Sequence, residues 1–305
     1  MLEIPLNWPM ESANQEMGKG ASFSHKGSNI VLDFHGNPLI AQLVVFSDGN
    51  HHMALEETLQ TFLKVNPGVK DVFYVTTPPP ILLSILESGK INVGNLELDL
   101  DCHFFIGPPN VCKQLVEKGK LKATMPFMRS RGNVLLVRKG NPKSIQGIED
   151  LYREDVRIFI SNPDEKSSHQ LYRKTLTNLA NNSELDGSKI DSLLSRPGER
   201  VVHGEVIHHR EAPQALAADR ADTCPLYYHL ALRYTRIFPD LFDIVPLGGT
   251  VDDPKPDPGN LSSYYETGLI GDGGKWGNRL HEYLMSEEVT NIYNRHGLLR
   301  PPSEG

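Results

Sequence analysis

Two adjacent serines stand at the start of a predicted helix, directly after a strand of buried type. Ser167 and Ser168 follow the apolar run 156–160 and the turn Ser161-Asn162-Pro163, and leucines at helical spacing continue from them. The first N–H groups of a helix have no acceptor within the helix, and the helix dipole favours negative charge there. In open α/β sheets, ligands bind beyond the carboxyl ends of strands. The pattern predicts an anion site with two hydroxyl groups.

Paired histidines are the second group with chemical potential. His51-His52 and His208-His209 each open a predicted helix, and Arg210 and Glu211 follow the second pair. A helix N-terminus disfavours a positive charge, so neutral imidazoles are expected, able to donate to an oxyanion or to ligate a metal. The spacing matches no standard zinc motif. We therefore expect no metal, and the residues that would supply one are His52, His208, His209 and Glu211.

Arg210 is a candidate for a bidentate clamp on a carboxylate or oxyanion, or for an ion pair with a neighbour such as Glu211.

Motifs for catalysis are missing. The sequence has no G-x-S-x-G, Walker or G-x-G-x-x-G pattern, no evident pair of carboxylates and no nucleophile–base spacing. Three cysteines, Cys102, Cys112 and Cys224, form no disulfide framework. An enzyme is therefore not favoured, and no cofactor is expected.

Composition limits the class of protein. The chain has 305 residues, of which 39% are hydrophobic and 23% charged, and its net charge is −7. This is an ordinary globular composition of two-lobe size without a basic footprint for nucleic acid. No run reaches the ~18 apolar residues that span a membrane. The first 20 residues contain no apolar signal core. We expect either a cytoplasmic protein or one whose signal segment preceded this numbering.

Strands and helices alternate along most of the chain, which favours parallel sheets with right-handed crossovers. Residues 1–38 are polar and irregular and are predicted to be an N-terminal extension. The predicted strands are 39–46, 69–75, 102–106, 134–137, 156–160, 201–207, 223–226, 242–247 and 264–270. The predicted helices between and after them include 51–63, 81–86, 109–116, 210–218, 228–234, 276–285 and 289–293.

The order of these elements resembles a known family. The unit of strand, helix, strand, loop and helix over 132–176, and the tail YYETGLIGDGGKWGNRLHEYLMSEEVTNIYNRHGL from Tyr264, are similar to type II periplasmic solute-binding proteins, in particular the molybdate-binding type. The resemblance covers about 39–300. It implies an α/β fold of two doubly wound lobes with a ligand cleft between them and a two-segment hinge, near 126–133 and 238–250. Lobe I would comprise 39–131 and 248–305, and lobe II 132–247.

The resemblance also implies a set of ligand-binding positions. In this family the anion is held by small polar side chains, backbone N–H groups and a tyrosine hydroxyl. The matching positions, together with the two basic candidates beside them, are Asn50, His51, Thr77, Ser167, Ser168, His209, Arg210 and Tyr227. Three prolines follow Thr77, and proline has no N–H. His209 is larger than the apolar residue expected there. The prolines remove donors from this wall of the site, and His209 points to a ligand that is larger than a tetrahedral metal oxyanion or carries a different charge.

The resulting expectation is a solute-binding protein that captures a small oxyanion or carboxylate. Its partner would be the permease of an ABC transporter in the periplasm, or the protein would act as a sensor if the chain is cytoplasmic. The alternative is an enzyme or a metal-binding or chaperone-type module that reuses this fold with a histidine-rich cleft. If His209 donates to the ligand, affinity should change in the histidine range, at about pH 6–7.

Overall fold

The computed structural model describes residues 33–93, 96–205 and 207–302, so most of the predicted N-terminal extension lies outside the described residues. The fold is mixed α/β, as predicted, and the chain divides into two compact units. Of the described residues, the first unit contains 33–129 and 264–302, and the second unit contains 130–263. None of the described helices is both long enough and apolar enough to cross a membrane.

The first unit is built on a mixed sheet. Among the described residues its strands run in the order β1-β3-β2-β6-β13-β7-β14. Their bounds are β1 Asp33–His35, β2 Leu43–Ser47, β3 Val72–Thr76, β6 Phe104–Gly107, β7 Met125–Ser130, β13 Tyr264–Leu269 and β14 Leu298–Leu299. Strands β2, β3 and β6 are parallel to one another, and they are almost entirely buried. Continuous apolar strands of this kind are typical of a sheet covered on both faces.

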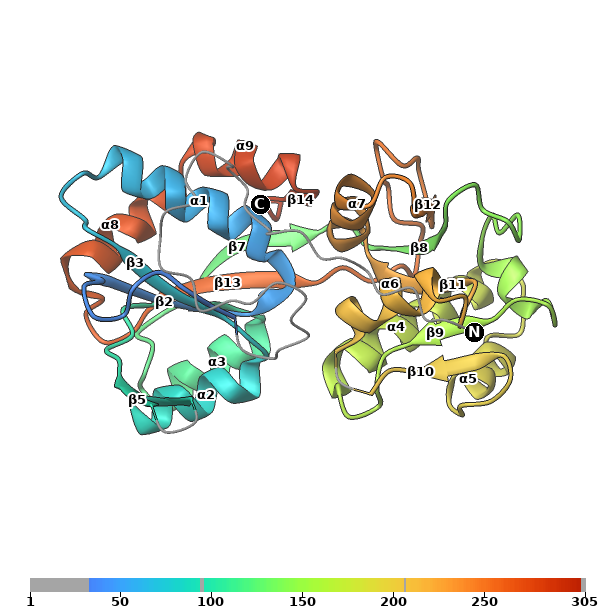
Figure 1. Ribbon diagram of the computed structural model, residues 1–305, viewed down its shortest axis with the longest axis horizontal. Helices are drawn as coiled ribbons and strands as arrows, with labels where there is room; N and C mark the ends of the chain where they lie inside the picture. The colour runs from blue at the N-terminus through green and yellow to red at the C-terminus, as the bar shows by residue number, and fades with distance from the viewer. Residues whose placement is uncertain (1–32, 94–95, 206, 303–305) are drawn as a thin grey trace. The chain divides into compact units, whose positions relative to one another are not determined.

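Helices cover both faces of this sheet (Figure 1). One face packs against α1 His52–Val65, α8 Gly274–Leu284 and α9 Glu287–Arg295. The other packs against α2 Pro79–Ser88 and α3 Pro109–Glu117, with the hairpin of β4 Lys90–Val93 and β5 Leu96–Asp99 beside them. The sidedness follows from the strand pleat, because alternate residues of β2 point to opposite faces. Val45 belongs to the first core and Phe46 to the second.

The predicted parallel arrangement is confirmed for β2, β3 and β6, but the whole sheet is mixed. Strand β13 is antiparallel to β6 and β7, and β1 is antiparallel to β3. A parallel strand needs a crossover, usually a helix, to bring the chain back to the same end of the sheet. The chain instead enters β13 directly after the second unit, so β13 can run in the opposite direction. The family-like tail from Tyr264 thereby supplies a central strand of the first unit.

The second unit is built on a five-stranded sheet among the described residues, in the order β10-β9-β11-β8-β12. The strands are β8 Asn133–Arg138, β9 Ile158–Ile160, β10 Val201–His203, β11 Thr223–Tyr227 and β12 Phe242–Pro246. The helices are η3 Ile148–Tyr152, α4 Lys166–Asn182, α5 Gly187–Leu194, α6 His208–Ala217 and α7 Tyr228–Ile237. Strands β9, β10 and β11 are parallel, whereas β8 is antiparallel to β11 and β12. Strand β10 ends at His203 and is shorter than the predicted strand 201–207, although the Gly204 N–H still donates to the Ile160 carbonyl of β9 at 2.8 Å.

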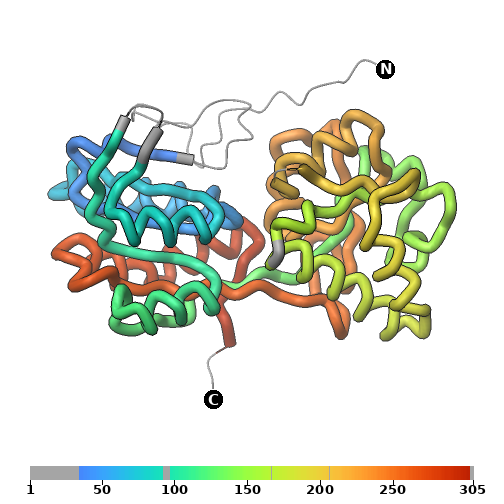
Figure 2. The backbone as a smooth tube through the Cα atoms, turned by 90° about the horizontal axis from the view of Figure 1, so that it is seen from below, coloured from blue at the N-terminus to red at the C-terminus, as the bar shows by residue number. Residues whose placement is uncertain are grey.

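The chain passes between the units at 129/130 and again at 263/264 (Figure 2). The first passage lies in the predicted range 126–133, but the second comes later than 238–250. Asn260 explains the delay, because its buried side chain donates to the carbonyl oxygens of Asn133 and Leu247, each at 2.9 Å. Its Oδ1 accepts the Asn133 N–H at 2.8 Å. These bonds hold residues 248–263 on the second unit.

Candidate functional site

The carboxyl ends of the parallel strands in the first unit carry a buried polar network. Ser47 ends β2, and its hydroxyl donates to the Asp48 carbonyl oxygen at 3.1 Å. The His51 Nε2 lies 3.0 Å from Ser47 Oγ, and His51 Nδ1 lies 3.0 Å from the Tyr293 hydroxyl. A neutral His51 protonated on Nε2 fits both contacts: it donates to Ser47 and accepts from Tyr293. The predicted ligand residue His51 is thus 2% exposed and positioned inside this unit.

Asp48 lies in the same network and is 4% exposed. Its Oδ1 accepts the Asn50 N–H at 3.2 Å, which caps the short helix η2 Gly49–His51. Burial raises the pKa of the Asp48 carboxyl to about 7, although the Asn50 N–H opposes the shift. A buried carboxylate without a cationic partner prefers its neutral form. Asp48 therefore titrates near neutral pH at a position where a ligand is expected.

Helix N-termini at this edge offer few amide hydrogens. Helix α2 begins with Pro79 after Pro78, and α3 begins with Pro109 after Pro108. Proline is well suited to the first turn of a helix but has no hydrogen to donate. The predicted ligand residue Thr77 is 1% exposed, and its N–H donates to the Ser47 carbonyl at 3.1 Å. The first unit brings Asn50, His51 and Thr77 together around Ser47 and Asp48, but most of its donors are already used.

The carboxyl ends of β9, β10 and β11 form the corresponding edge of the second unit. Ser161 follows β9, and its carbonyl accepts the His169 Nδ1–H at 2.8 Å. Helix α4 starts after a turn with Glu165 as its N-cap, whose own side chain makes no capping bond there. The Ser167 side chain is exposed, and Ser168 is half-buried. The first N–H groups of a helix have no acceptor within the helix, so the turn that carries Ser167 and Ser168 offers donors of the predicted kind.

Glu165 is the residue that the sequence analysis missed. Its Oε1 accepts the backbone N–H of His208 at 2.9 Å, which is the first N–H of α6. The Ser168 hydroxyl donates to the Glu165 carbonyl at 3.1 Å and lies 3.4 Å from Oε2. Burial raises the pKa of the Glu165 carboxyl to about 7, and the Glu211 charge adds to that shift. An acid at the start of a polar helix is the one sequence signal that could have found it.

The histidines of the second unit are engaged with protein groups. The His208 Nε2–H donates to the Pro225 carbonyl at 2.7 Å, and burial lowers the pKa of this ring to about 4. His209 is half-buried, and its carbonyl accepts the Tyr234 hydroxyl. Arg210 is half-buried, and its N–H donates to Ile207. The Glu211 carboxylate accepts the Glu205 N–H at 3.0 and 3.1 Å.

Metal candidates do not gather in the described part of the chain. No group of three or more His, Cys, Asp or Glu side chains there could hold a metal ion. His52 belongs to the first unit, and its Nδ1–H donates to the Gly49 carbonyl at 2.8 Å. His208 uses Nε2 on a carbonyl, and Glu211 caps a backbone N–H. These candidates therefore act as parts of helix starts.

Tyr227 ends β11 and is 5% exposed. Its ring stacks on His229 at 5.4 Å between centroids and lies 5.3 Å from the Tyr172 ring, which in turn lies 4.6 Å from the His208 ring. The aromatic cluster thus links the end of β11 with the starts of α4 and α6. The structure brings Ser168, His208 and Tyr227 to one edge, with Ser167 at its exposed rim.

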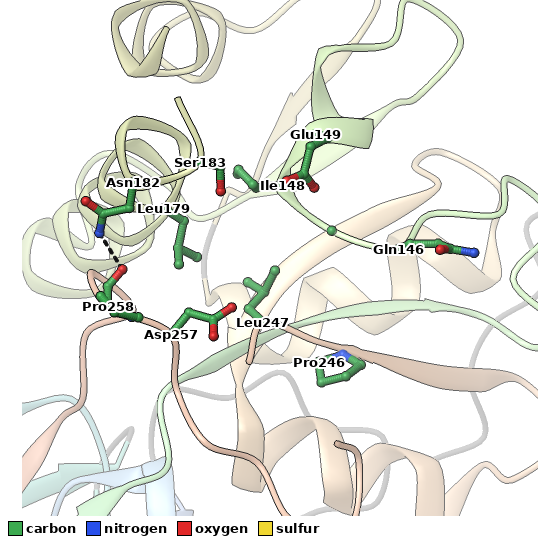
Figure 3. Close-up of a pocket in the computed structure, with 11 residues that line it drawn as sticks. Gln146, Ile148, Glu149, Leu179, Asn182, Ser183, Pro246, Leu247, Asp257 and Pro258 are labelled. Carbon is green, nitrogen blue, oxygen red and sulfur yellow. Dashed lines mark hydrogen bonds between the residues drawn. The ribbon is translucent and has the colours of Figure 1, made fainter. Parts of the chain in front are cut away.

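A pocket of about 330 Å³ lies elsewhere in the second unit (Figure 3). It is lined by residues of η3, of the end of α4 and of the segment after β12, and none of the predicted site residues contributes to it. Glu149 and Asp257 line it, and no Lys, Arg or His does. Two carboxylates without a cation make this pocket unsuited to an anion, so the edge at β9, β10 and β11 is the better candidate site.

Comparisons of structure support a relationship at the level of the fold. Peb3 from Campylobacter jejuni is 15% identical, with 85% of this chain and 100% of that chain covered and a TM-score of 0.58. PEB3 bound to L-phospholactate is 17% identical, with 85% and 100% covered and a TM-score of 0.59. The sulfate-binding protein SubI from Mycobacterium tuberculosis is 16% identical, with 86% of each chain covered and a TM-score of 0.60.

A putative molybdenum transporter's substrate-binding domain from Clostridium difficile is 17% identical, with 85% of this chain and 98% of that chain covered and a TM-score of 0.59. The predicted likeness to type II binding proteins of the molybdate kind is confirmed at this level. No curated protein matches the sequence. A family model for bacterial extracellular solute-binding proteins matches residues 43–299, most of the chain, and the protein belongs to that family.

Proposed function

We propose that this protein captures a small organic acid or a singly charged oxyanion and that the first turn of α4 holds its negative group. The single observation that carries the proposal is the open start of this 17-residue helix, with Ser167 exposed and Ser168 beside it. A helix start combines several N–H donors with the positive end of the dipole. Two hydroxyls at the same turn add donors that suit a carboxylate.

The proposal places the negative group of the ligand on the second unit. In the first unit, Ser47, Asp48 and His51 are buried and bonded within that unit, so this network is scaffold. In two-lobed binding proteins in general, a bound ligand stabilises the closed form.

The low ligand charge in this proposal rests on Glu165 at the start of α4. Burial raises the pKa of this carboxyl to about 7, so it carries charge at pH 7 and above. A ligand of high negative charge at the first turn of α4 would be repelled by this carboxylate. Among the fold relatives, PEB3 has been solved with L-phospholactate, an organic anion with a carboxylate and a phosphate group, which supports extending the class to organic anions.

The proposed partner is the permease of an ABC transporter, and the proposed compartment is the periplasm or the outer surface of the cell. The family description supports both, since its members are extracellular solute-binding proteins. A solute sensor would use the same capture step and would differ only in the protein that reads the closed form.

The experiment is a thermal-unfolding screen against hydroxy acids, amino acids, simple carboxylates and inorganic oxyanions. A solute at 100 times its Kd should stabilise the protein by about 2.7 kcal/mol and raise the melting temperature. Isothermal titration of each positive solute should then give a stoichiometry of about one. A melting temperature that stays unchanged across every anionic solute, while uncharged sugars or divalent cations raise it, would contradict the proposal.

A further inference from the structure

The carboxylate of Glu165 already occupies donor groups that an anion would use. It accepts the first N–H of α6 at 2.9 Å, and the Ser168 hydroxyl lies 3.4 Å from its other oxygen. Glu165 is the N-cap residue of α4, so one carboxylate stands at the starts of two helices. A bound anion at two helix starts would make the same kinds of contact. A carboxylate of the protein itself thus lies at the starts of these two helices, where an anionic ligand could bind.

We infer that Glu165 determines the specificity of the second unit: it excludes doubly charged tetrahedral oxyanions and admits ligands with a single negative group. The inference rests on the proposed function, in which α4 holds the anion. A dianion at the α4 turn would lie next to the Glu165 carboxylate, and the repulsion grows in proportion to the ligand's charge. A singly charged ligand meets half of that repulsion and can keep the Ser167 and α4 donors.

Charged and titratable groups of both signs surround Glu165, and Lys166 follows it directly in the sequence. Glu211 on α6 is a further carboxylate, and its effect on Glu165 is to raise the pKa. Burial lowers the pKa of His208 on α6 and of His169 on α4, so both rings are neutral near pH 7. Arg173 on α4 is paired with Asp191 at 2.7 Å, and Asp164 precedes the helix. Arg210 and His209 are the remaining groups at the start of α6 that can carry positive charge.

The test compares sulfate and molybdate as probes by isothermal titration on the wild type, Glu165→Gln and Glu165→Ala. Glutamine keeps an acceptor for the His208 N–H and removes the charge. At pH 8 both variants should bind at least one of the probes about tenfold or more tightly than the wild type does. Glu199→Gln is the matched control, because Glu199 is exposed and precedes β10 at the opposite end of the strand. It should bind like the wild type.

The pH dependence gives a second readout. From pH 8 to pH 6 the wild-type affinity for the same probe should rise toward that of Glu165→Gln, whose affinity should stay nearly constant. The backbone amide resonance of His208 should titrate near pH 7 in the wild type and lose that titration in Glu165→Gln. Melting temperatures within a few degrees of the wild type would show that the variants are folded.

Equal probe affinities in the wild type and both Glu165 variants, including no binding by any of them, would overturn the inference. The proposed function is judged separately. If the wild type binds an organic acid but neither variant gains affinity for a dianion, the proposed function is supported and the proposed role of Glu165 is contradicted. If the variants gain sulfate or molybdate affinity but no organic acid or singly charged oxyanion binds the wild type, the role of Glu165 stands and the proposed ligand class falls.

Discussion

The edges at the carboxyl ends of the parallel strands carry similar residues in the two units, but these residues have different roles. In the first unit, Ser47 and His51 are closed off from solvent and bonded to each other and to Tyr293. In the second unit, Ser167 is exposed at an uncapped helix start. Sequence position alone made both edges equal candidates. A serine or histidine that follows a strand can therefore be part of the scaffold or can contact a ligand. The exposure of the neighbouring helix start distinguishes these two roles.

The largest expected effect comes from breaking the scaffold of the first unit. His51→Ala would leave the Tyr293 hydroxyl and Ser47 Oγ without their buried partner and would open a cavity. We expect a loss of about 2–4 kcal/mol in the free energy of unfolding. His209→Ala, at a half-buried position, should lose about 1 kcal/mol or less. Chemical denaturation of both variants measures the contrast, and equal losses would remove the distinction between the edges.

The next effect concerns the pH dependence of stability. The folded-state pKa of Asp48 is raised from 3.8 to about 7, so folding favours the protonated form and stability falls as pH rises through this window. Asp48→Asn removes the ionisation and keeps an acceptor for the Asn50 N–H. It should stabilise the protein by roughly 1–4 kcal/mol at pH 8 and by much less at pH 4. A stabilisation that is the same at both pH values would show that the ionised Asp48 carboxylate does not destabilise the folded protein.

A smaller effect separates the two serines of α4. Ser168 already donates to the Glu165 carbonyl, whereas the Ser167 side chain is exposed. Ser167→Ala should therefore weaken solute binding more, by roughly 1–2 kcal/mol against about 0.5 kcal/mol for Ser168→Ala. Isothermal titration with the solute found in the screen gives both values. A double variant with wild-type affinity would show that this helix start is only scaffold.

The smallest effect distinguishes two groups that could make binding depend on pH. Glu165 has its pKa raised to about 7 and lies at the proposed site. We expect solute affinity to fall from pH 6 to pH 8 in the wild type and in His209→Ala, and to stay nearly flat in Glu165→Gln. Titrations at four pH values suffice. If His209→Ala instead abolishes the dependence, the original expectation for His209 is the correct one.

Much of the fold could be predicted from the sequence because local patterns determine its elements. Leu55, Leu59 and Leu63 recur at helical spacing, and α1 forms there as His52–Val65. The hairpin of β4 and β5 was not predicted, although Ile91, Val93, Leu96 and Leu98 alternate across it. The place of β13 between β6 and β7 depends on residues more than 130 positions away, and no local pattern could reveal it.

The candidate site was predictable only in part. The serines at the start of α4 follow from strand and turn signals, because a helix must begin after Pro163. An acid at the start of a helix could have drawn attention to Glu165, but its contact with the His208 N–H, 43 residues further along the chain, could not be predicted from a local pattern. The late second passage between units has the same cause, because it depends on how Asn260 bonds to Asn133 and Leu247.

The most direct test of the central claim is hydrogen exchange of backbone amides with and without the solute found in the screen. We expect slower exchange over residues 166–170 at the start of α4 when the solute is bound, because the ligand would contact this turn. We also expect little change around Glu149 and Asp257, which line the acidic pocket. A solute that binds with protection at that pocket, and none at the start of α4, would contradict the account.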